Sequence, residues 1–230
     1  MFSIVAKCVH EPLPSIRTMI KVSEVEAFCY DKDMQKPDPL FFAIQQLNID
    51  LSLINRNHYL AGTNRRENDI EHSMTVAILC WYIHDKHHLD LDIAKILKYA
   101  LAHDFVERYA GDVNTFASTS ERNDKVLREK ESLDRLSGEF SEFGDLITSM
   151  SEYELKNDEE SLFVWTVDKM QQLIMGDMDN WRPYAEINIS YDQFTTKYAE
   201  LVAKSSPHCC DIFSGVVEYS KSTYYDQPKT

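Results

Sequence analysis

Apolar positions recur at helical spacing along most of the chain after Asp38. A stripe over residues 41–54 predicts a first core helix, with Arg56 at its C-terminal end. The segment IEHSMTVAILCWYI (residues 70–83) is apolar on nearly all sides, which predicts a buried central helix. A further stripe within residues 92–103 runs through Ile93, Ile96, Leu97, Ala100 and Leu101. No alternation with a period of two runs long enough to predict a useful strand.

Four later helix starts carry capping signals. Three are pairs with the spacing of a capping box, namely Ser118 with Glu121, Asn157 with Glu160, and Ser190 with Gln193. The fourth is Ser206-Pro207, an N-cap followed by proline at the first helical position. They predict helices over roughly 119–137, 158–176, 191–204 and 207–222. The fold class that follows is an all-α bundle.

The same pattern predicts the organisation of the chain. Residues 1–38 contain prolines and little periodicity, which indicates an N-terminal extension. Residues 39–180 form the predicted core, and residues 181–230 are predicted to be C-terminal helices packed on that core. Only 6 Gly and 7 Pro in 230 residues favour long helices over a loop-rich β-sandwich.

Charge narrows the range of partners. The chain has 24 Lys and Arg against 38 Asp and Glu, a formal net charge of −14. Such a field repels duplex nucleic acid and acidic membrane surfaces, so we expect neither as a partner. No apolar run approaches the ~20 residues of a membrane span, and the start of the chain does not resemble a signal peptide. Five cysteines without a CxxC spacing indicate a reduced, cytoplasmic protein.

Four residues point to a metal. His103 and Asp104 end the apolar stripe KILKYALAHD, His72 lies in the apolar segment 70–83, and Asp168 interrupts SLFVWTVDKMQQLIM. Burying these groups without a partner would be costly, and a cation removes that cost. Two imidazoles and two carboxylates suit one divalent metal such as Mn²⁺, Co²⁺, Fe²⁺, Ni²⁺ or Zn²⁺, with Mg²⁺ left open. Four protein ligands would leave positions for water and a phosphoryl oxygen.

The residues around these positions carry a resemblance. RRENDIEHS (residues 65–73), AHDFVERYAGD (102–112) and TVDKM (166–170) occur in this order, and LINR (53–56) precedes them. Together they resemble the HD-domain phosphohydrolases and, within them, the 5′-deoxynucleotidase group. An HD dipeptide alone says little, whereas the full series placed on helices is specific. The resemblance covers roughly residues 40–180.

The resemblance implies an HD-domain helical bundle with a central metal site. It implies that the metal is held by His72, His103, Asp104 and Asp168. It also implies that Glu107 is the acid/base catalyst and that Asp112 positions the attacking water or a sugar hydroxyl. Arg56 would bind the phosphate, and Arg65 would brace the site or the substrate. Two departures stand out. Val113-Asn114-Thr115-Phe116 follows Asp112 where the family often has prolines. Asn57 replaces an aromatic residue that crowds the ribose 2′ position, so selectivity for the sugar stays open.

The expected function is hydrolysis of (deoxy)nucleoside 5′-monophosphates to nucleoside and phosphate, with a nucleotide as substrate. One alternative is a triphosphohydrolase that releases triphosphate from a dNTP, as in phage dATP triphosphohydrolases. A cyclic-nucleotide phosphodiesterase ranks lower, and a non-catalytic nucleotide-binding protein is the alternative outside enzymes. The base, the native metal and formation of a homodimer are left open by the sequence.

Overall fold

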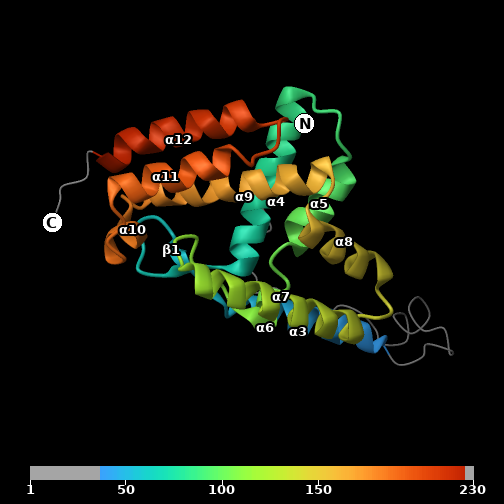
Figure 1. The fold of residues 1–230 in the computed structure, drawn as a ribbon. Coiled ribbons are helices and arrows are strands. Elements are labelled where there is room, and N and C mark those ends of the chain that lie inside the picture. Colours follow the sequence, from blue (N-terminus) through green and yellow to red (C-terminus); the bar gives the residue numbers. More distant parts are fainter. Residues whose placement is uncertain (1–36, 226–230) are drawn as a thin grey trace, which may run out of the picture. The chain divides into compact units, whose positions relative to one another are not determined.

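The computed structural model describes residues 37–225, and the account below concerns the unit from Leu40 onward. The predicted extension at 1–38 lies almost entirely outside the described residues. The elements are α3 (Pro39–Ser52), β1 (Asn55–Tyr59), β2 (Arg66–Asn68), α4 (Asp69–His87), α5 (Ile93–Ala102), α6 (Glu107–Ala110), α7 (Thr119–Glu139), α8 (Gly144–Leu155), α9 (Glu159–Met178), α10 (Arg182–Glu186), α11 (Tyr191–Val202) and α12 (Cys210–Tyr225) (Figure 1). The all-α prediction is confirmed, with one short hairpin as an addition.

Helices α4, α5 and α9 pack against one another and form the centre of the fold. Their shared cluster includes Val76, Cys80, Ile96, Val164 and Val167, all fully buried. Helix α12 packs against both α9 and α11, and lies above them in the view of Figure 1. A second cluster joins α3, α7 and α8 to the turn after α5. The site residues of α4 and α9 therefore face each other within a packed interior.

Capping explains where several helices begin. The capping boxes at Ser118 and Ser190 are present, so α7 and α11 begin where the sequence predicts. The start of α9 was misplaced by one residue, because the side chain of Asp158 accepts from the Ser161 N–H and Asp158, not Asn157, is the N-cap. Helix α12 begins at Cys210 rather than at Pro207. The reason is that Ser206 is buried against α9, where its N–H donates to Thr166 Oγ1 at 2.8 Å.

Helix α4 is not buried on all sides. Met74, Ile78, Trp81 and Tyr82 are each more than half exposed. Helices α5 and α9 cover only part of its circumference, and apolar composition alone does not specify how many neighbours a helix has. The expectation of a wholly buried central helix is therefore wrong for one face.

The hairpin corrects the placement of Arg56. We expected this residue at the end of the first core helix, but α3 ends at Ser52 and Arg56 lies on β1. Strands β1 and β2 pair antiparallel, with Asn55 opposite Asn68 and Tyr59 opposite Arg66. The register shifts between these two pairs, so the strict alternation of side chains is interrupted where Arg56 and His58 lie.

In the part of the chain that the structure describes, no helix combines the length and the apolar character that crossing a bilayer requires.

Gly176 of α9 is required by the packing of Trp181. A Cβ at position 176 would lie 2.6 Å from Trp181 Cζ3 and 2.8 Å from Cε3. Trp181 is buried and contacts Tyr184, Phe194 and Tyr224 through its ring. We predict that Gly176→Ala lowers the free energy of unfolding by about 1–3 kcal/mol, measured by urea denaturation, because the ring must move.

Gly215→Ala on α12 is the matched control, since nothing lies within 4 Å of a Cβ there. Its free energy of unfolding should rise by up to about 1 kcal/mol, because alanine restricts the unfolded chain. Equal stabilisation by both substitutions would show that Trp181 does not pack against Gly176.

Candidate metal centre

Two buried imidazoles face each other at the centre of the fold. His72 comes from α4 and His103 directly follows α5, and their ring centroids are 5.2 Å apart. His103 Nδ1 lies 2.9 Å from the carbonyl oxygen of Ala100, and His72 Nδ1 lies 3.1 Å from Gln171 Oε1. Because each Nδ1 faces an oxygen acceptor, we assign the proton of the neutral ring to Nδ1, which leaves a lone pair on Nε2 for a metal.

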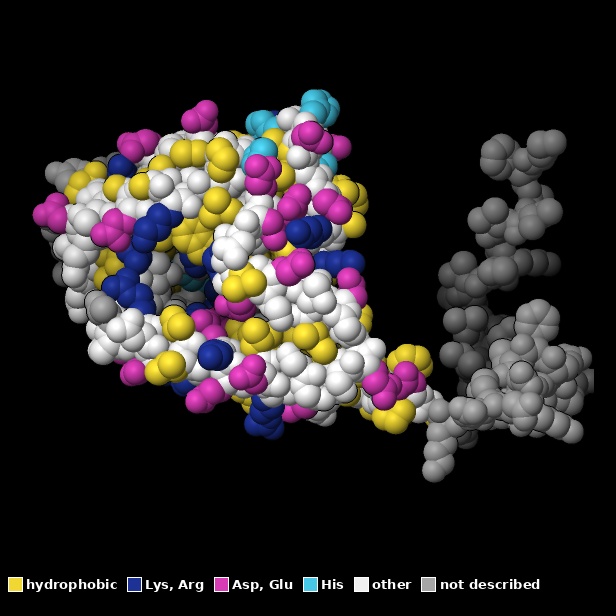
Figure 2. Space-filling view, turned by 45° about the vertical axis from the view of Figure 1, so that its right-hand side comes forward, with side chains coloured by type: hydrophobic (Ala, Val, Ile, Leu, Met, Phe, Trp, Pro, Cys, Tyr) yellow, Lys and Arg dark blue, Asp and Glu magenta, His cyan; other side chains and the backbone are white. Residues whose placement is uncertain are grey.

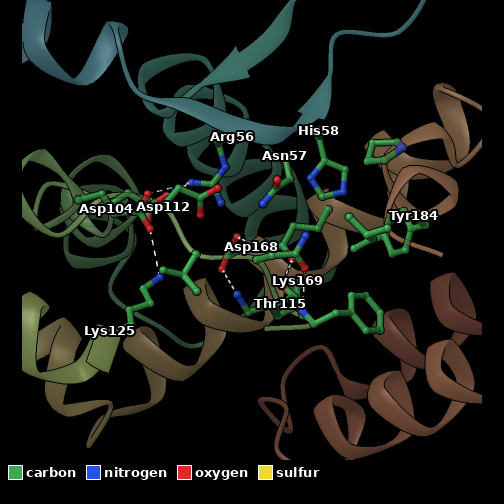
Figure 3. A pocket seen from close by; sticks show the side chains of 17 residues that line it. Arg56, Asn57, His58, Asp104, Asp112, Thr115, Lys125, Asp168, Lys169 and Tyr184 are labelled. Carbon is green, nitrogen blue, oxygen red and sulfur yellow. Dashed lines mark hydrogen bonds and ion pairs between the residues drawn. The ribbon is translucent and has the colours of Figure 1, made fainter. Parts of the chain in front are cut away.

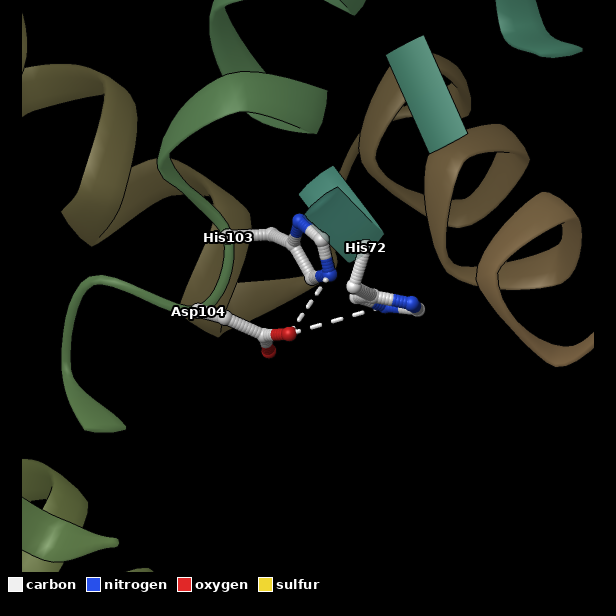
Figure 4. Close-up of side chains that lie close together, drawn as sticks. All are labelled: His72, His103 and Asp104. Carbon is white, nitrogen blue, oxygen red and sulfur yellow. Dashed lines mark ion pairs between the residues drawn. The ribbon is translucent and has the colours of Figure 1, made fainter. Parts of the chain in front are cut away.

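Both Nε2 atoms are buried and lack a hydrogen-bond partner among the described residues. Carboxylate oxygens approach them instead. Asp104 Oδ2 lies 3.1 Å from His103 Nε2 and 3.6 Å from His72 Nε2 (Figure 4), and Asp168 Oδ1 lies 3.1 Å from His72 Nε2. Ligand atoms of His72, His103 and Asp104 fall within 4.8 Å of one another. Unpartnered imidazole nitrogens converging with carboxylates fit a divalent cation.

The end of α5 makes this arrangement possible. Neighbouring residues on a continuous helix point about 100° apart, so His103 and Asp104 would diverge. After Ala102 the chain leaves the helix through a turn, in which the Phe105 N–H donates to the Ala102 carbonyl and the Glu107 N–H to the Asp104 carbonyl. Asp104 thereby turns back toward the His103 ring.

The charges in the centre depend on one another. Burial opposes ionisation of Asp104, but His103 and Arg56 outweigh it and hold the pKa of Asp104 well below its usual range. Burial also opposes ionisation of Asp168, whose pKa Lys169 and His72 hold low. Burial and Arg56 act to lower the pKa of His72, while the nearby carboxylates of Asp168 and Glu67 raise it to about 9, so a metal must compete with a proton for this ring. The centre therefore holds negative oxygen ligands and attracts positive charge.

Glu67 and Gln171 contact His72 on the Nδ1 side of its ring. Gln171 Nε2 donates to Glu67 Oε1 at 2.8 Å, and Glu67 Oε2 lies 3.6 Å from His72 Nδ1. All three side chains are buried. Such partners fix the tautomer and orientation of a metal-binding histidine.

A second group of acids adjoins the centre. Oxygen atoms of Asp69, Asp104 and Glu107 lie within 4.8 Å of one another. The guanidinium of Arg56 provides their counter-charge, with Nη1 2.6 Å from Asp104 Oδ2, 3.2 Å from Asp69 Oδ1 and 3.7 Å from Glu107 Oε2. Arg56 is itself buried. It is the fixed cation of this half of the site.

Glu107 has the properties of a proton donor. Burial and the nearby Asp104 raise its pKa well above the usual range, although Arg56 and Lys125 oppose the shift. Lys125 Nζ lies 3.2 Å from Glu107 Oε1. A raised pKa favours the protonated carboxyl, the form that general acid catalysis requires.

A pocket lies beside these groups (Figure 3). One end is lined by charged side chains, which are Arg56, Asp104, Glu107, Asp112, Lys125, Asp168 and Lys169. The other end contains His58, Phe116, Pro183, Tyr184 and Ile187. The space-filling view shows a hollow with Lys and Arg side chains along its rim (Figure 2). The pocket thus has a charged end and an aromatic end.

Most predicted site residues meet in this pocket. Asp112 follows Gly111, whose φ of 73° is in the left-handed region that favours glycine, and it lines the charged end. Arg65 is different. Its guanidinium makes hydrogen bonds of 2.8 and 2.7 Å to Glu71, it is largely exposed, and it is not in the pocket wall. Arg65 thus braces the start of α4, the helix that carries His72.

Four residues near the centre were not anticipated, namely Glu67, Asp69, Lys125 and Gln171. Gln171 lies three residues after Asp168 on α9, so helical spacing could have placed it on the same face. Asp69 looks from sequence like an acid in the first turn of α4, and Lys125 like one charge among many on α7. Only the tertiary structure brings these side chains to the site.

Solved structures share this fold. A crystal structure of a predicted metal-dependent phosphohydrolase from Magnetospirillum magnetotacticum MS-1 superposes with a TM-score of 0.68 at 22% identity, covering 82% of this chain and 97% of that one. A conserved hypothetical protein from Pyrococcus furiosus gives 0.54 at 20% identity, covering 77% and 99%. A protein from Pyrococcus horikoshii OT3 gives 0.55 at 21% identity, covering 77% and 98%. At these identities the likeness shows the fold alone.

No curated protein matches the chain. A family model described as an HD domain does match it, over residues 50–209. That range begins before β1, includes all the residues of the centre described above and extends to the start of α12. The chain therefore belongs to the HD-domain family.

Proposed function

We propose that the protein is a metal-dependent phosphohydrolase that removes phosphate from nucleoside 5′-monophosphates. The observation that carries the proposal is the pair of buried, unpartnered Nε2 atoms of His72 and His103, which face Asp104 and Asp168 within the described part of the chain. The HD-domain family of the chain supports it, as does the neighbour from Magnetospirillum described as a predicted metal-dependent phosphohydrolase.

The side chains around the pocket have complementary roles in this proposal. His72, His103, Asp104 and Asp168 would hold one divalent metal, which when bound supplies an activated water and neutralises phosphoryl charge. Arg56 binds phosphoryl oxygens through its planar guanidinium. Glu107, protonated through its raised pKa, gives a proton to the leaving sugar oxygen. Asp112 positions the attacking water or a sugar hydroxyl.

The charge of the pocket favours a phosphate monoester. Four carboxyl groups and three basic side chains line it. The raised pKa of Glu107 favours its neutral form, while Asp69, 3.2 Å from Arg56, adds a carboxyl group, so a divalent cation leaves a small positive surplus. A phosphate monoester carries about two negative charges near neutral pH, so it would balance this surplus. A triphosphate would exceed it.

A triphosphohydrolase is the second candidate. Lys125 and Lys169 line the pocket in addition to Arg56, and these extra positive charges would favour a triphosphate. The two reactions differ in product. The purified protein should be incubated with nucleoside and deoxynucleoside monophosphates and with dNTPs, in the presence of Mn²⁺, Co²⁺ or Mg²⁺. The proposal requires release of inorganic phosphate from monophosphates. Release of triphosphate from dNTPs alone would establish the second candidate.

We predict that Asp104→Ala abolishes both metal binding and phosphate release, because Asp104 Oδ2 approaches both imidazoles. Binding is measured by titration of Mn²⁺ into chelator-treated protein. The chain offers a matched control in Asp85→Ala, which changes the other His-Asp pair at an exposed end of α4. That variant should keep both properties. Full activity of the metal-free wild type would contradict the proposal.

Glu107→Gln should bind metal normally and lower kcat by ~10²-fold or more, because an amide cannot transfer the proton. The control is Glu129→Gln, which also removes a carboxylate paired with Lys125, at 3.1 Å, but lies outside the pocket wall. Steady-state kinetics with metal content measured in parallel checks the result. Loss of metal from the Glu107→Gln variant would make Glu107 a ligand, and unchanged kcat would remove it from catalysis.

Arg56→Lys tests the phosphate contact without leaving Asp69 and Asp104 buried and unpaired. We predict that kcat/KM falls by ~10–10³-fold while metal affinity stays within a few-fold, since a point charge cannot bind two phosphoryl oxygens as the planar fork does. Arg66→Lys on the same hairpin, which pairs with Glu186 at 3.1 Å, is the control and should keep its kcat/KM. An equal kcat/KM in both variants would show that Arg56 serves only to neutralise the acids.

A further inference from the structure

The proposed transfer of phosphate uses only the charged end of the pocket and leaves the aromatic end without a role. His58 lies edge-on to Tyr184, with ring centroids 5.7 Å apart and an interplanar angle of 63°. Phe116 contacts the same tyrosine at 5.6 Å and 78°. Pro183 and Ile187 complete an apolar wall. A pocket of this composition suits a flat, largely apolar ring.

The hairpin sets the distance between the two ends. His58 follows Arg56 by two residues on β1, so their Cα atoms lie about 6–7 Å apart. Both side chains line this pocket, although the pairing of β1 with β2 is irregular between Asn55 and Tyr59. Figure 3 shows Arg56, Asn57, His58 and Tyr184 in succession across the pocket. A 5′-nucleotide separates its phosphate from its base on this length scale, with the sugar between. A phosphate at Arg56 would therefore place the base near His58.

His58 has an unused polar atom at this end. Its Nε2 is buried and has no hydrogen-bond partner within residues 37–225. The Tyr184 hydroxyl, by contrast, already pairs with the Tyr198 hydroxyl at 2.9 Å. Burial, together with Arg56 and His72, lowers the pKa of His58 to about 3, so its ring is neutral at physiological pH. A neutral imidazole offers one donor and one acceptor.

We infer that the aromatic end is a nucleobase subsite and that His58 is its specificity-determining residue, binding the polar edge of a heteroaromatic ring that packs against Tyr184 and Phe116. The inference rests on the proposed function and adds to it the residue that recognises the base. The enzyme then selects nucleotides over sugar phosphates that lack a base.

The test compares two substrates that share the reacting phosphate. kcat/KM is measured with Mn²⁺-loaded protein for a panel of deoxynucleoside 5′-monophosphates and for 2-deoxyribose 5-phosphate, which has no base. The quantity of interest is the ratio of the two values. We expect the wild type to favour the best nucleotide, and His58→Ala to lower the ratio by about 10-fold or more, as the loss of a base contact requires.

Two further variants separate the contribution of the aromatic ring of His58 from that of its nitrogen atoms. His58→Phe keeps the ring but loses its nitrogens, and should also lower the ratio, whereas His58→Gln keeps polar atoms and should restore it in part. The control His87→Ala changes an exposed histidine at the end of α4 and should leave the ratio unchanged. Phosphate release from both substrates with the same ratio in the wild type and all His58 variants overturns the base subsite alone. Release from neither substrate by the wild type overturns the proposed function and this inference together.

Discussion

The structure depends on compensation of buried negative charge. Asp69, Glu107 and Asp168 are almost completely buried, and Asp104 is close to them. An unpaired carboxylate in a protein interior costs several kcal/mol, so these acids require cations or must bind protons. Arg56 neutralises part of the negative charge in one half of the cluster, and a proton on Glu107 lowers that charge further. The other half has two imidazole nitrogens aimed at carboxylates, which is the arrangement that a metal completes.

The packing of the helices places the charged residues close to one another. His72 and Asp168 come from α4 and α9, the two helices that also share the largest apolar cluster, so packing of the core positions both ligands. The hairpin between α3 and α4 delivers Arg56 and His58 from one strand to the two ends of the pocket. The stable interior thereby orients the charged centre, and the short segments around it determine what the pocket accepts.

Sequence reasoning predicted the residues with strong local signals. The all-α class, the helices capped at Ser118 and Ser190, and the family were predictable because periodicity, caps and motif spacing are local. The prediction that Arg56 lies on a helix was wrong because the five residues of β1 show no clear alternation of apolar and polar side chains. Glu67 and Lys125 were missed because a single charged residue looks like surface until its partners, Gln171 and Glu107, are known. The exposed face of α4 was missed because an apolar segment does not reveal how many helices cover it.

The central claim is that the two imidazoles and two carboxylates bind one divalent cation. The most direct measurement is a crystal structure of the Mn²⁺-loaded protein with anomalous scattering recorded near the manganese edge. The account predicts one strong anomalous peak per chain within about 2.0–2.4 Å of His72 Nε2, His103 Nε2 and oxygens of Asp104 and Asp168. A peak among Asp69, Asp104 and Glu107 with Arg56 displaced, or no peak at either place, would contradict it.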